Sequence, residues 1–360
     1  MEAIATKPEN VLSQRWDSLL ADEPSLRIRN AAQRLGVSEL ALLLSRDEGV
    51  KSLKPEFGAL MKQMNSVGEV MILTRNEQVV HEVTAAYKKF VVSGKGAMGL
   101  SVGDIDLRVF FNHWAYGYHV TQEIRGVVRE SLQFFSAYGL ALQKVYKTQA
   151  TDTAAWNELV ASYLDSSQPV PELTPAPAPR PRANAAEVDA EALKDSWANI
   201  KDVHHFHAML QRNKVDRLTA VELVGPEWAR PLKSSAEGIL SPLDRILEQA
   251  QINGCPIMVF VGNPGLVQIF GGTINKLKRT GSWMNVLDPG FNLHANTDGI
   301  TDWWVVVRPS TDGDITSIEG YNADGDIVIT LFGNRKPGQP ELAAWRREVG
   351  ALEKVLCVSA

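Results

Sequence analysis

The chain has 360 residues, of which 44% are hydrophobic and 22% charged, and its formal net charge is −5. This length exceeds a single typical core, so two domains are expected, and the composition is that of a globular protein rather than a disordered one. The acidic balance argues against a surface built for nucleic acid, and an anionic ligand would have to be held by locally grouped arginines.

The N-terminus shows no targeting signal. The stretch Met1–Pro8 lacks the apolar core of a secretory signal peptide, and no window of about 18 apolar residues occurs anywhere. The two cysteines, Cys255 and Cys357, are too few for a disulfide framework or a thiolate zinc site. We therefore expect a cytoplasmic protein with no membrane insertion.

A proline-rich stretch divides the chain. Residues 166–190 include the run Pro175-Ala176-Pro177-Ala178-Pro179, which cannot form a helix or a central strand and should be extended. We expect three parts: an N-terminal repeat over residues 1–165, this Pro/Ala-rich linker over residues 166–190, and a C-terminal repeat over residues 191–360.

The two parts that flank the linker resemble each other. Blocks with the same internal spacing recur in the same order: Gln33-Arg34 and Gln211-Arg212, Met71-Ile72-Leu73 with Asn76 and Met258-Val259-Phe260 with Asn263, Ser131 with Tyr146 and Ser317 with Phe332, and Ala154-Ala155-Trp156 and Ala343-Ala344-Trp345. Such agreement is hard to obtain by chance, so the chain is predicted to be a tandem duplication.

Each repeat is predicted to begin with helices and to continue with strands. In the second repeat, residues 257–261 and 266–270 flank a Gly-Asn-Pro-Gly turn and should form a hairpin. Further strands are expected at residues 303–308, 315–321 and 327–332. A terminal helix should cover one sheet face with Trp345, Val349, Leu352 and Leu356. The predicted fold class is α+β: a tandem duplication of an α+β repeat, each with a largely antiparallel sheet flanked by helices, not a doubly wound nucleotide-binding fold.

Three of the seven histidines lie within four positions, in the segment Asp202-Val203-His204-His205-Phe206-His207. With Asp202 as N-cap and Asn213 as the stop, a short helix would place His204 and His207 on one face and His205 on another. Near a helix N-terminus the backbone dipole disfavours a charged imidazole, which leaves a neutral nitrogen able to coordinate a metal. The alternative is that these histidines are solvated or cap the helix.

The duplication supplies an internal comparison for this cluster. When the repeats are aligned through their Gln-Arg blocks, the histidines fall opposite Leu26-Arg27-Ile28-Arg29, where there is no histidine. A structural role would predict similar residues in both repeats, so the asymmetry favours a site with one metal or haem per chain. A single neutral histidine suffices as an axial haem ligand, whereas zinc would need a third ligand that does not accompany the His204/His207 pair.

The other histidines are weaker candidates. His113 and His119 lie among aromatic residues around Trp114, a pattern that favours a core or an interface. His81 is expected on an exposed strand face opposite Gln268 of the other repeat, and His294 near a strand end. Neither of these two has a partner visible in the sequence.

Several motifs spread over both repeats resemble one family. They are Leu107-Arg108-Val109-Phe110, Asp202-Val203-His204, Arg217, Gly238-Ile239-Leu240-Ser241-Pro242-Leu243-Asp244, Met258-Val259-Phe260-Val261-Gly262-Asn263 and Gly333-Asn334-Arg335. In this order, and over nearly the whole chain, they resemble the bacterial cytoplasmic haem-utilisation proteins, the haemin-degrading factor family of HemS/PhuS-type haem chaperones. The His-His-Phe-His segment is most similar to the pseudomonad haem-trafficking members.

The resemblance implies one noncovalent haem b per chain, held between the repeats, and no Cys-x-x-Cys-His motif for covalent attachment is present. It makes His204 the axial iron ligand and puts Arg108 on the opposite face with Phe110 beside it. It also implies that Phe260 forms an apolar wall and that Phe332 contacts the cofactor. Arg217, Arg308 and Arg335 are expected near the propionates. Guanidinium forks suit carboxylates, and a macrocycle needs apolar faces.

Two departures from the family pattern limit this transfer. Phe332 stands where some relatives are expected to carry Tyr, so a phenol hydroxyl is absent, and Arg308 stands where others carry Lys. The additional His207, about one helical turn after His204, is an alternate iron ligand by hypothesis. Ligand exchange of this kind would suit a protein that must release its cargo.

The leading functional interpretation is a haem chaperone that receives haem, with an inner-membrane importer as donor, and delivers it to a haem oxygenase. The alternative is an enzyme that opens the macrocycle itself with reductant and oxygen, and the family includes both assignments. A haem-responsive DNA-binding regulator is a third interpretation, which the acidic balance disfavours.

Overall fold

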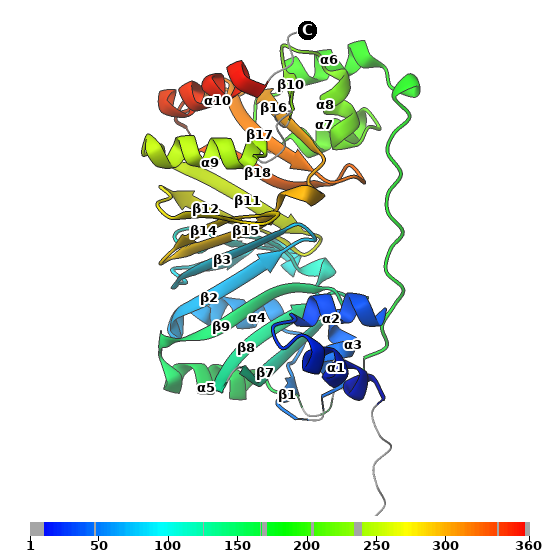
Figure 1. The fold of residues 1–360 in the computed structure, drawn as a ribbon, viewed down its shortest axis with the longest axis vertical. Coiled ribbons are helices and arrows are strands. Elements are labelled where there is room, and N and C mark those ends of the chain that lie inside the picture. Colours follow the sequence, from blue (N-terminus) through cyan, green and yellow to red (C-terminus); the bar gives the residue numbers. More distant parts are fainter. Residues whose placement is uncertain are drawn as a thin grey trace, which may run out of the picture.

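The computed structural model describes residues 11–46, 48–124, 126–165, 167, 171–202, 205–233, 240–336 and 338–356. Two large sheets are stacked in the middle of the molecule, and helices lie at both far ends (Figure 1). Within these described ranges, no helix is long and apolar enough to cross a membrane.

The helices and strands follow one another in the same order in the two halves. The first half contains α1 (Val11–Asp22), α2 (Ile28–Leu35), α3 (Glu39–Leu44), β1 (Val50–Ser52), α4 (Phe57–Gln63), β2 (Gly68–Arg75), β3 (Val79–Ala86), β4 (Phe90–Val92), β5 (Met98–Ser101), β6 (Asp106–Phe110), β7 (Tyr116–Ile124), β8 (Val127–Phe135), β9 (Ala141–Thr151) and α5 (Thr153–Tyr163). The second half contains α6 (Ala190–Ala198), α7 (Phe206–Arg212), α8 (Arg217–Leu223), β10 (Ala229–Leu232), α9 (Pro242–Ile252), β11 (Ile257–Asn263), β12 (Leu266–Gly272), β13 (Leu277–Thr280), β14 (Trp283–Asp288), β15 (Phe291–Asn296), β16 (Asp302–Arg308), β17 (Ile315–Tyr321), β18 (Ile327–Gly333) and α10 (Ala343–Leu356). The duplicated α+β fold is confirmed.

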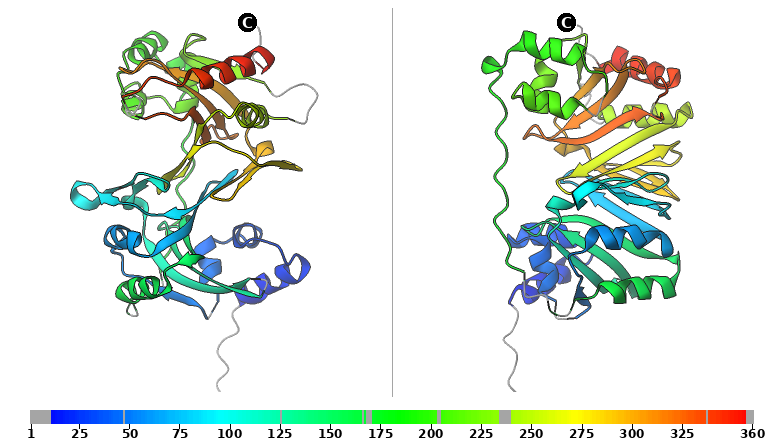
Figure 2. Two further views of the ribbon diagram at one scale, coloured as in Figure 1. Left: turned by 90° about the vertical axis from the view of Figure 1, so that its left-hand side faces the viewer. Right: turned by 180° about the vertical axis from the view of Figure 1, so that it is seen from behind.

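The two halves exchange strands. One nine-stranded sheet has the order β1-β7-β8-β9-β2-β3-β15-β14-β13 and the other the order β10-β16-β17-β18-β11-β12-β6-β5-β4, with antiparallel neighbours throughout. Three strands of each repeat therefore complete the sheet of the other. In the left view of Figure 2 the β4–β5 hairpin (cyan) projects on the side of α6–α8, and the β13–β14 hairpin (gold) projects on the side of α1–α3.

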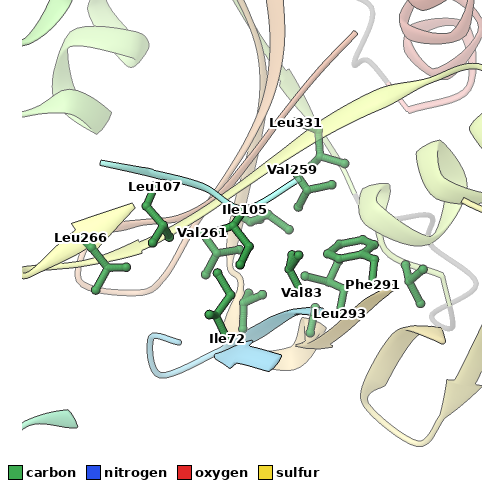
Figure 3. Close-up of a cluster of buried hydrophobic side chains, with 14 of the residues drawn as sticks. Ile72, Val83, Ile105, Leu107, Val259, Val261, Leu266, Phe291, Leu293 and Leu331 are labelled. Atoms are coloured by element: carbon green, nitrogen blue, oxygen red, sulfur yellow. The ribbon is translucent and has the colours of Figure 1, made fainter. Parts of the chain in front are cut away.

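The main hydrophobic core lies where the sheets face each other. Ile72, Val83, Leu293 and Phe291 come from one sheet, and Leu107, Val259, Val261, Leu266 and Leu331 come from the other (Figure 3). The core continues under α9 and α10. The four apolar residues of α10 that were predicted to cover the sheet, Trp345, Val349, Leu352 and Leu356, are all buried. Alternating apolar residues thus point into the core and leave the opposite face of each sheet half exposed.

Two asparagines join the halves by matching hydrogen bonds. The Asn76 amide donates to the other repeat and the Asn263 amide donates back, and these are the two asparagines that the sequence repeat aligns. The acceptors are the carbonyl oxygens of Gly262 (3.3 Å) and Val328 (2.7 Å) for Asn76, and of Arg75 (3.1 Å) and Leu142 (2.8 Å) for Asn263. Since Gly262 and Val328 are the counterparts of Arg75 and Leu142, the contact has twofold pseudosymmetry.

His81 is buried, so its predicted exposure is wrong. The sheet face that carries it packs on the other repeat, where the Gln268 amide nitrogen lies 2.9 Å from His81 Nδ1. Gln268 is the sequence counterpart of His81, and its carbonyl accepts from Thr74 at 2.6 Å. Burial lowers the pKa of His81 to about 3, so this imidazole is neutral and structural at physiological pH.

The Pro/Ala-rich segment runs extended along one side of the molecule, between its lower and upper halves (Figure 1). Its described residues 171–184 form no helix or strand. Tyr116 donates to the carbonyl oxygen of Glu172 at 2.9 Å, and Arg182 donates to Thr219 at 3.1 Å. The segment is therefore attached to both halves, and its limits at residues 166 and 190 stay a prediction.

Replacing Asn263 by Ala should lower the free energy of unfolding by about 1–3 kcal/mol, because buried carbonyl groups lose their donor. Urea denaturation would measure the difference. Asn157→Ala, on the exposed surface of α5, is the matched control and should change stability by less than about 0.5 kcal/mol. Equal effects in the two variants would show that the contact between the halves is not stabilising.

Candidate functional site

The helix that follows the histidine cluster begins later than predicted. α7 starts at Phe206 with His205 as N-cap, and the His205 backbone N–H donates to the carbonyl oxygen of Asp202 at 2.9 Å. The predicted N-cap at Asp202 is therefore wrong for α7, whose first residue, Phe206, is buried. The predicted end at Asn213 is confirmed. His204 lies outside the described residues.

His205 and His207 have different surroundings. His205 lines a cavity of about 300 Å³ between α6 and α7, together with Ser196, Asn199, Ile200, Lys201, Ala208, Met209 and Arg212. His207 is exposed, and its Nε2 accepts a hydrogen bond from the Gln211 amide one turn later, at 3.1 Å. For a metal to take His207 Nε2, Gln211 must first release it.

Phe206 holds the start of α7 against the sheet. Its ring lies under two guanidinium groups, with the Arg308 carbon 4.1 Å and the Arg217 carbon 5.3 Å from the ring centroid. The Trp197 ring of α6 meets it edge-on, with centroids 5.0 Å apart. Cation–π and aromatic contacts therefore fix the position from which the histidine segment departs.

Both guanidinium groups are held by one buried carboxylate. Glu319 has no exposed surface, and it accepts hydrogen bonds from Arg217 at 2.7 and 3.0 Å and from Arg308 at 2.6 Å. Ser317 and Tyr321 donate to the same carboxylate. Burial alone would raise the pKa of Glu319, but the two guanidiniums outweigh it and hold the pKa well below its usual range.

This carboxylate changes what Arg217 and Arg308 can do. The two were assigned to the propionates by resemblance, but here both donate to Glu319. The side chain of Arg308 is only 3% exposed, whereas that of Arg217 is 29% exposed and keeps an accessible edge. Any contact between Arg308 and a ligand carboxylate would require it to leave Glu319, and both assignments stay predictions.

Arg108 and Phe110 lie on the accessible side of β6. Their side chains are half exposed, whereas Leu107 and Val109, which alternate with them along the strand, are buried, as predicted. The Arg108 guanidinium forms an ion pair with Asp106 on the same face. Burial raises the pKa of Asp106, and Arg108 offsets part of this rise. Arg108 belongs to the first repeat but occupies the sheet of the second.

Half-exposed apolar side chains continue this face across neighbouring strands. The register aligns Phe260 of β11 with Ile269 of β12, which in turn pairs with Asp106. Phe332 of β18 pairs with Met258 of β11, and its ring meets that of Phe260 at a centroid distance of 5.1 Å. We call the set Phe332, Met258, Phe260, Arg108 and Phe110 the open face.

The open face extends to the edge of the sheet. Leu100 pairs with Arg108 and Met98 with Phe110, and these two side chains are 39% and 47% exposed. The β4–β5 hairpin thus adds an exposed apolar border beside the guanidinium. Neither residue was predicted, because a short run of apolar residues in a strand usually indicates core.

Arg335 lies in the loop after β18, away from Glu319. Its guanidinium donates to Asp312 at 2.7 Å and to the carbonyl oxygen of Gln339 at 3.1 Å. Its predicted role near a carboxylate stays a prediction. Glu319 and Asp106 were both missed in the sequence. Glu319 had a signal, because an acidic residue at a buried position of an apolar strand indicates a buried ion pair. Within the described ranges, no three His, Cys, Asp or Glu side chains are grouped to hold a metal ion.

Replacing Glu319 by Gln should lower the free energy of unfolding by about 3–5 kcal/mol at pH 7, since two buried guanidiniums lose their countercharge. The difference should be full above pH 4.5, the ordinary pKa of the carboxyl, and should shrink as the pH falls towards the lowered folded pKa. Urea denaturation at pH 7 and pH 3 would measure this. Glu353→Gln, which removes a partly exposed ion pair with Arg230, should cost less than about 1 kcal/mol. A pH-independent difference would contradict the assignment.

Comparison with known proteins agrees with this architecture. The haemin-degrading HemS.ChuX domain matches residues 36–163 and again residues 214–352. The hemin transport protein HemS of Yersinia enterocolitica is 38% identical over 333 residues, which cover 92% of this chain and 94% of that protein. The structure of holo-PhuS, a heme-binding protein from Pseudomonas aeruginosa, has a TM-score of 0.91 at 40% identity and covers 98% of this chain and 100% of that one. The heme degrading enzyme ChuS of Escherichia coli O157:H7 has a TM-score of 0.85 at 33% identity, covering 96% and 99%. The chain belongs to the haemin-degrading HemS/ChuX family and carries the family domain twice.

Proposed function

We propose that this chain is a cytoplasmic haem-binding protein that accepts imported haem, keeps it soluble and passes it to a haem oxygenase. One noncovalent haem b would lie between the open face and the segment before α7, with His204 as axial ligand. The observation that carries the proposal is the open face itself. It sets half-exposed aromatic and thioether side chains beside the Arg108 guanidinium, in the same sheet on which Phe206 seats the histidine-bearing helix.

The side chains of the open face and the arginines around it suit haem as a ligand. Phe260, Phe332 and Met258 offer an adjoining set of half-exposed apolar side chains of the kind that a macrocycle needs. Arg108, with Phe110 beside it, would lie across the macrocycle from His204. Arg335 and the exposed edge of Arg217 are basic groups suited to carboxylates, and the buried Arg308 would act through Phe206 and Glu319. When bound, haem would supply a redox-active iron and two carboxylates.

The relatives support haem as the ligand but differ in the fate of the haem after it binds. PhuS is described as a heme-binding protein and HemS as a hemin transport protein, whereas ChuS is described as a heme oxygenase. The second candidate for this chain is therefore an enzyme that cleaves the macrocycle with reductant and oxygen. The observation that favours delivery is the surplus of histidines around His204, which suits exchange of the iron ligand. An inner-membrane haem importer would act as donor.

His204→Ala should still bind ferric haem, with an altered Soret band, because His207 can replace the lost ligand once Gln211 releases it. His204→Ala/His207→Ala should lose saturable binding at this site. His205→Ala, which removes a histidine from the cavity beside α6, is the matched control and should leave the spectrum unchanged. Absorption titration measures all three, and wild-type spectra in both His204 variants would exclude these ligands.

The loaded protein should transfer its haem when mixed with a haem oxygenase, and its Soret band should fall as the oxygenase gains haem. Ascorbate with catalase, and no oxygenase, should leave the bound haem intact. Stoichiometric cleavage that persists in catalase would instead establish the enzyme. Cleavage that catalase abolishes would mark coupled oxidation by free peroxide and would leave the delivery proposal standing.

A further inference from the structure

The pseudosymmetry of the fold gives the open face a counterpart in the other sheet. Tyr146, Met71, Leu73 and Val80 occupy the positions of Phe332, Met258, Phe260 and Val267. All four are half exposed. We call this set, with His294, the N-terminal face. Lys144, the strand neighbour of Leu73, forms an ion pair with Glu39 of α3, so this face lies on the side of α3.

His294 stands at the position that Arg108 occupies on the open face. In one sheet β6 pairs Arg108 with Val267, and in the other β15 pairs His294 with Val80, the counterpart of Val267. The position that carries a guanidinium on the open face therefore carries an imidazole on the N-terminal face. The sequence repeat aligns the same two residues, because Arg108 and His294 have the spacing of Ser131 and Ser317.

Hydrogen bonds fix the tautomer of His294. Its Nδ1 lies 2.7 Å from the side-chain carbonyl oxygen of Asn285, which can only accept. The Asn285 amide nitrogen donates to the carbonyl oxygens of Lys278 (2.8 Å) and Trp283 (3.1 Å), so the amide cannot turn round. His294 therefore carries its proton on Nδ1 and presents a bare Nε2, the arrangement by which an outer hydrogen bond prepares a histidine for a metal.

His294 is also neutral at physiological pH. Burial lowers its pKa, Glu82 opposes this effect, and the charge of Arg27 adds to the lowering. Its Nε2 accepts no hydrogen bond from any described residue and is not among the buried unpaired atoms. Arg27 is the N-cap residue of α2, as His205 is of α7. Because Arg27 is the sequence counterpart of His205, the N-terminal face has its guanidinium on the helix side and its imidazole on the strand.

Arg75 adds a cation without a countercharge in direct contact. Its Nε donates to the carbonyl oxygen of Asn76 at 3.2 Å, and within the described ranges it forms no ion pair. Burial and the neighbouring Arg29 lower its pKa to about 10, while the Glu39 carboxylate acts in the opposite direction, so Arg75 stays charged at pH 7. Arg75 lies at the end of β2, two residues from Leu73 on the same face, where its guanidinium would meet a ligand carboxylate.

We propose that the N-terminal face binds a second iron porphyrin, more weakly than the first, through His294 Nε2, with Arg75 taking a carboxylate. The apolar residues Met71, Leu73 and Val80 supply the surface for the macrocycle. The ligand class rests on the proposed function of the open face. The position of the imidazole, its tautomer and the nearby Arg75 cation are independent of that function.

Titration of the full-length protein with ferric haem tests this proposal. Wild type should bind two equivalents, His294→Gln one, and His204→Ala/His207→Ala one. In His294→Gln the amide still donates to Asn285 but cannot ligate iron. Asn285→Ala should weaken the second site by about tenfold through loss of the tautomer. His113→Gln, at an exposed histidine of the 3₁₀ turn Phe111–His113, should behave as wild type.

The outcomes separate the two proposals. Saturation of wild type at one equivalent that His294→Gln leaves unchanged would overturn the second site. A second phase that is insensitive to His294, or equally strong with metal-free protoporphyrin IX, would mean adventitious binding and would overturn it too. Two equivalents in His204→Ala/His207→Ala would instead contradict the ligand assignment of the proposed function. Circular dichroism of each variant would establish that it is folded.

Discussion

The arrangement of the two repeats depends on the hydrogen bonds that Asn76 and Asn263 each donate to backbone carbonyls of the opposite repeat. Each amide satisfies backbone carbonyls of the opposite repeat, and the His81–Gln268 pair repeats this logic a few residues away. Buried polar groups that are satisfied only by the other repeat fix a single relative placement. That placement allows three strands of each repeat to extend the sheet of the other, so the two halves form one interdependent structure.

The repeats differ most in the charges beneath their short helices. In the second repeat Arg217 and Arg308 surround Glu319, whereas in the first Glu39, the counterpart of Arg217, pairs with the buried Lys144. Both arrangements bury a salt bridge. In the second repeat the guanidiniums also lie over the ring of Phe206, the first residue of the histidine-bearing helix. A shared scaffold therefore carries two charge networks, and the one under α7 restrains the segment where iron ligation is proposed.

Much of the local structure could be predicted because its causes are local. The apolar strand patterns and turn residues predicted the hairpin of β11 and β12 and the strands β16–β18, and helical periodicity predicted α10. The exchange of β6 and β15 could not be predicted, since strand pairing across more than a hundred residues leaves no periodic signal. The start of α7 was mistaken because Asp202 is a good N-cap in isolation, while burial of Phe206 decides the outcome. Glu319 was missed because its buried partners come from other elements.

Strand exchange has a direct consequence for where chemistry can reside. The second repeat supplies the histidine segment and Met258, Phe260 and Phe332 of the open face, but Arg108 and Phe110 reach that face on β6 of the first repeat. The N-terminal face in turn receives His294 on β15 of the second repeat. Neither face is complete within one repeat, so an ancestral single domain would have needed a second copy to assemble the same groups. Duplication allowed the borrowed position to diverge, to a guanidinium on one face and an imidazole on the other.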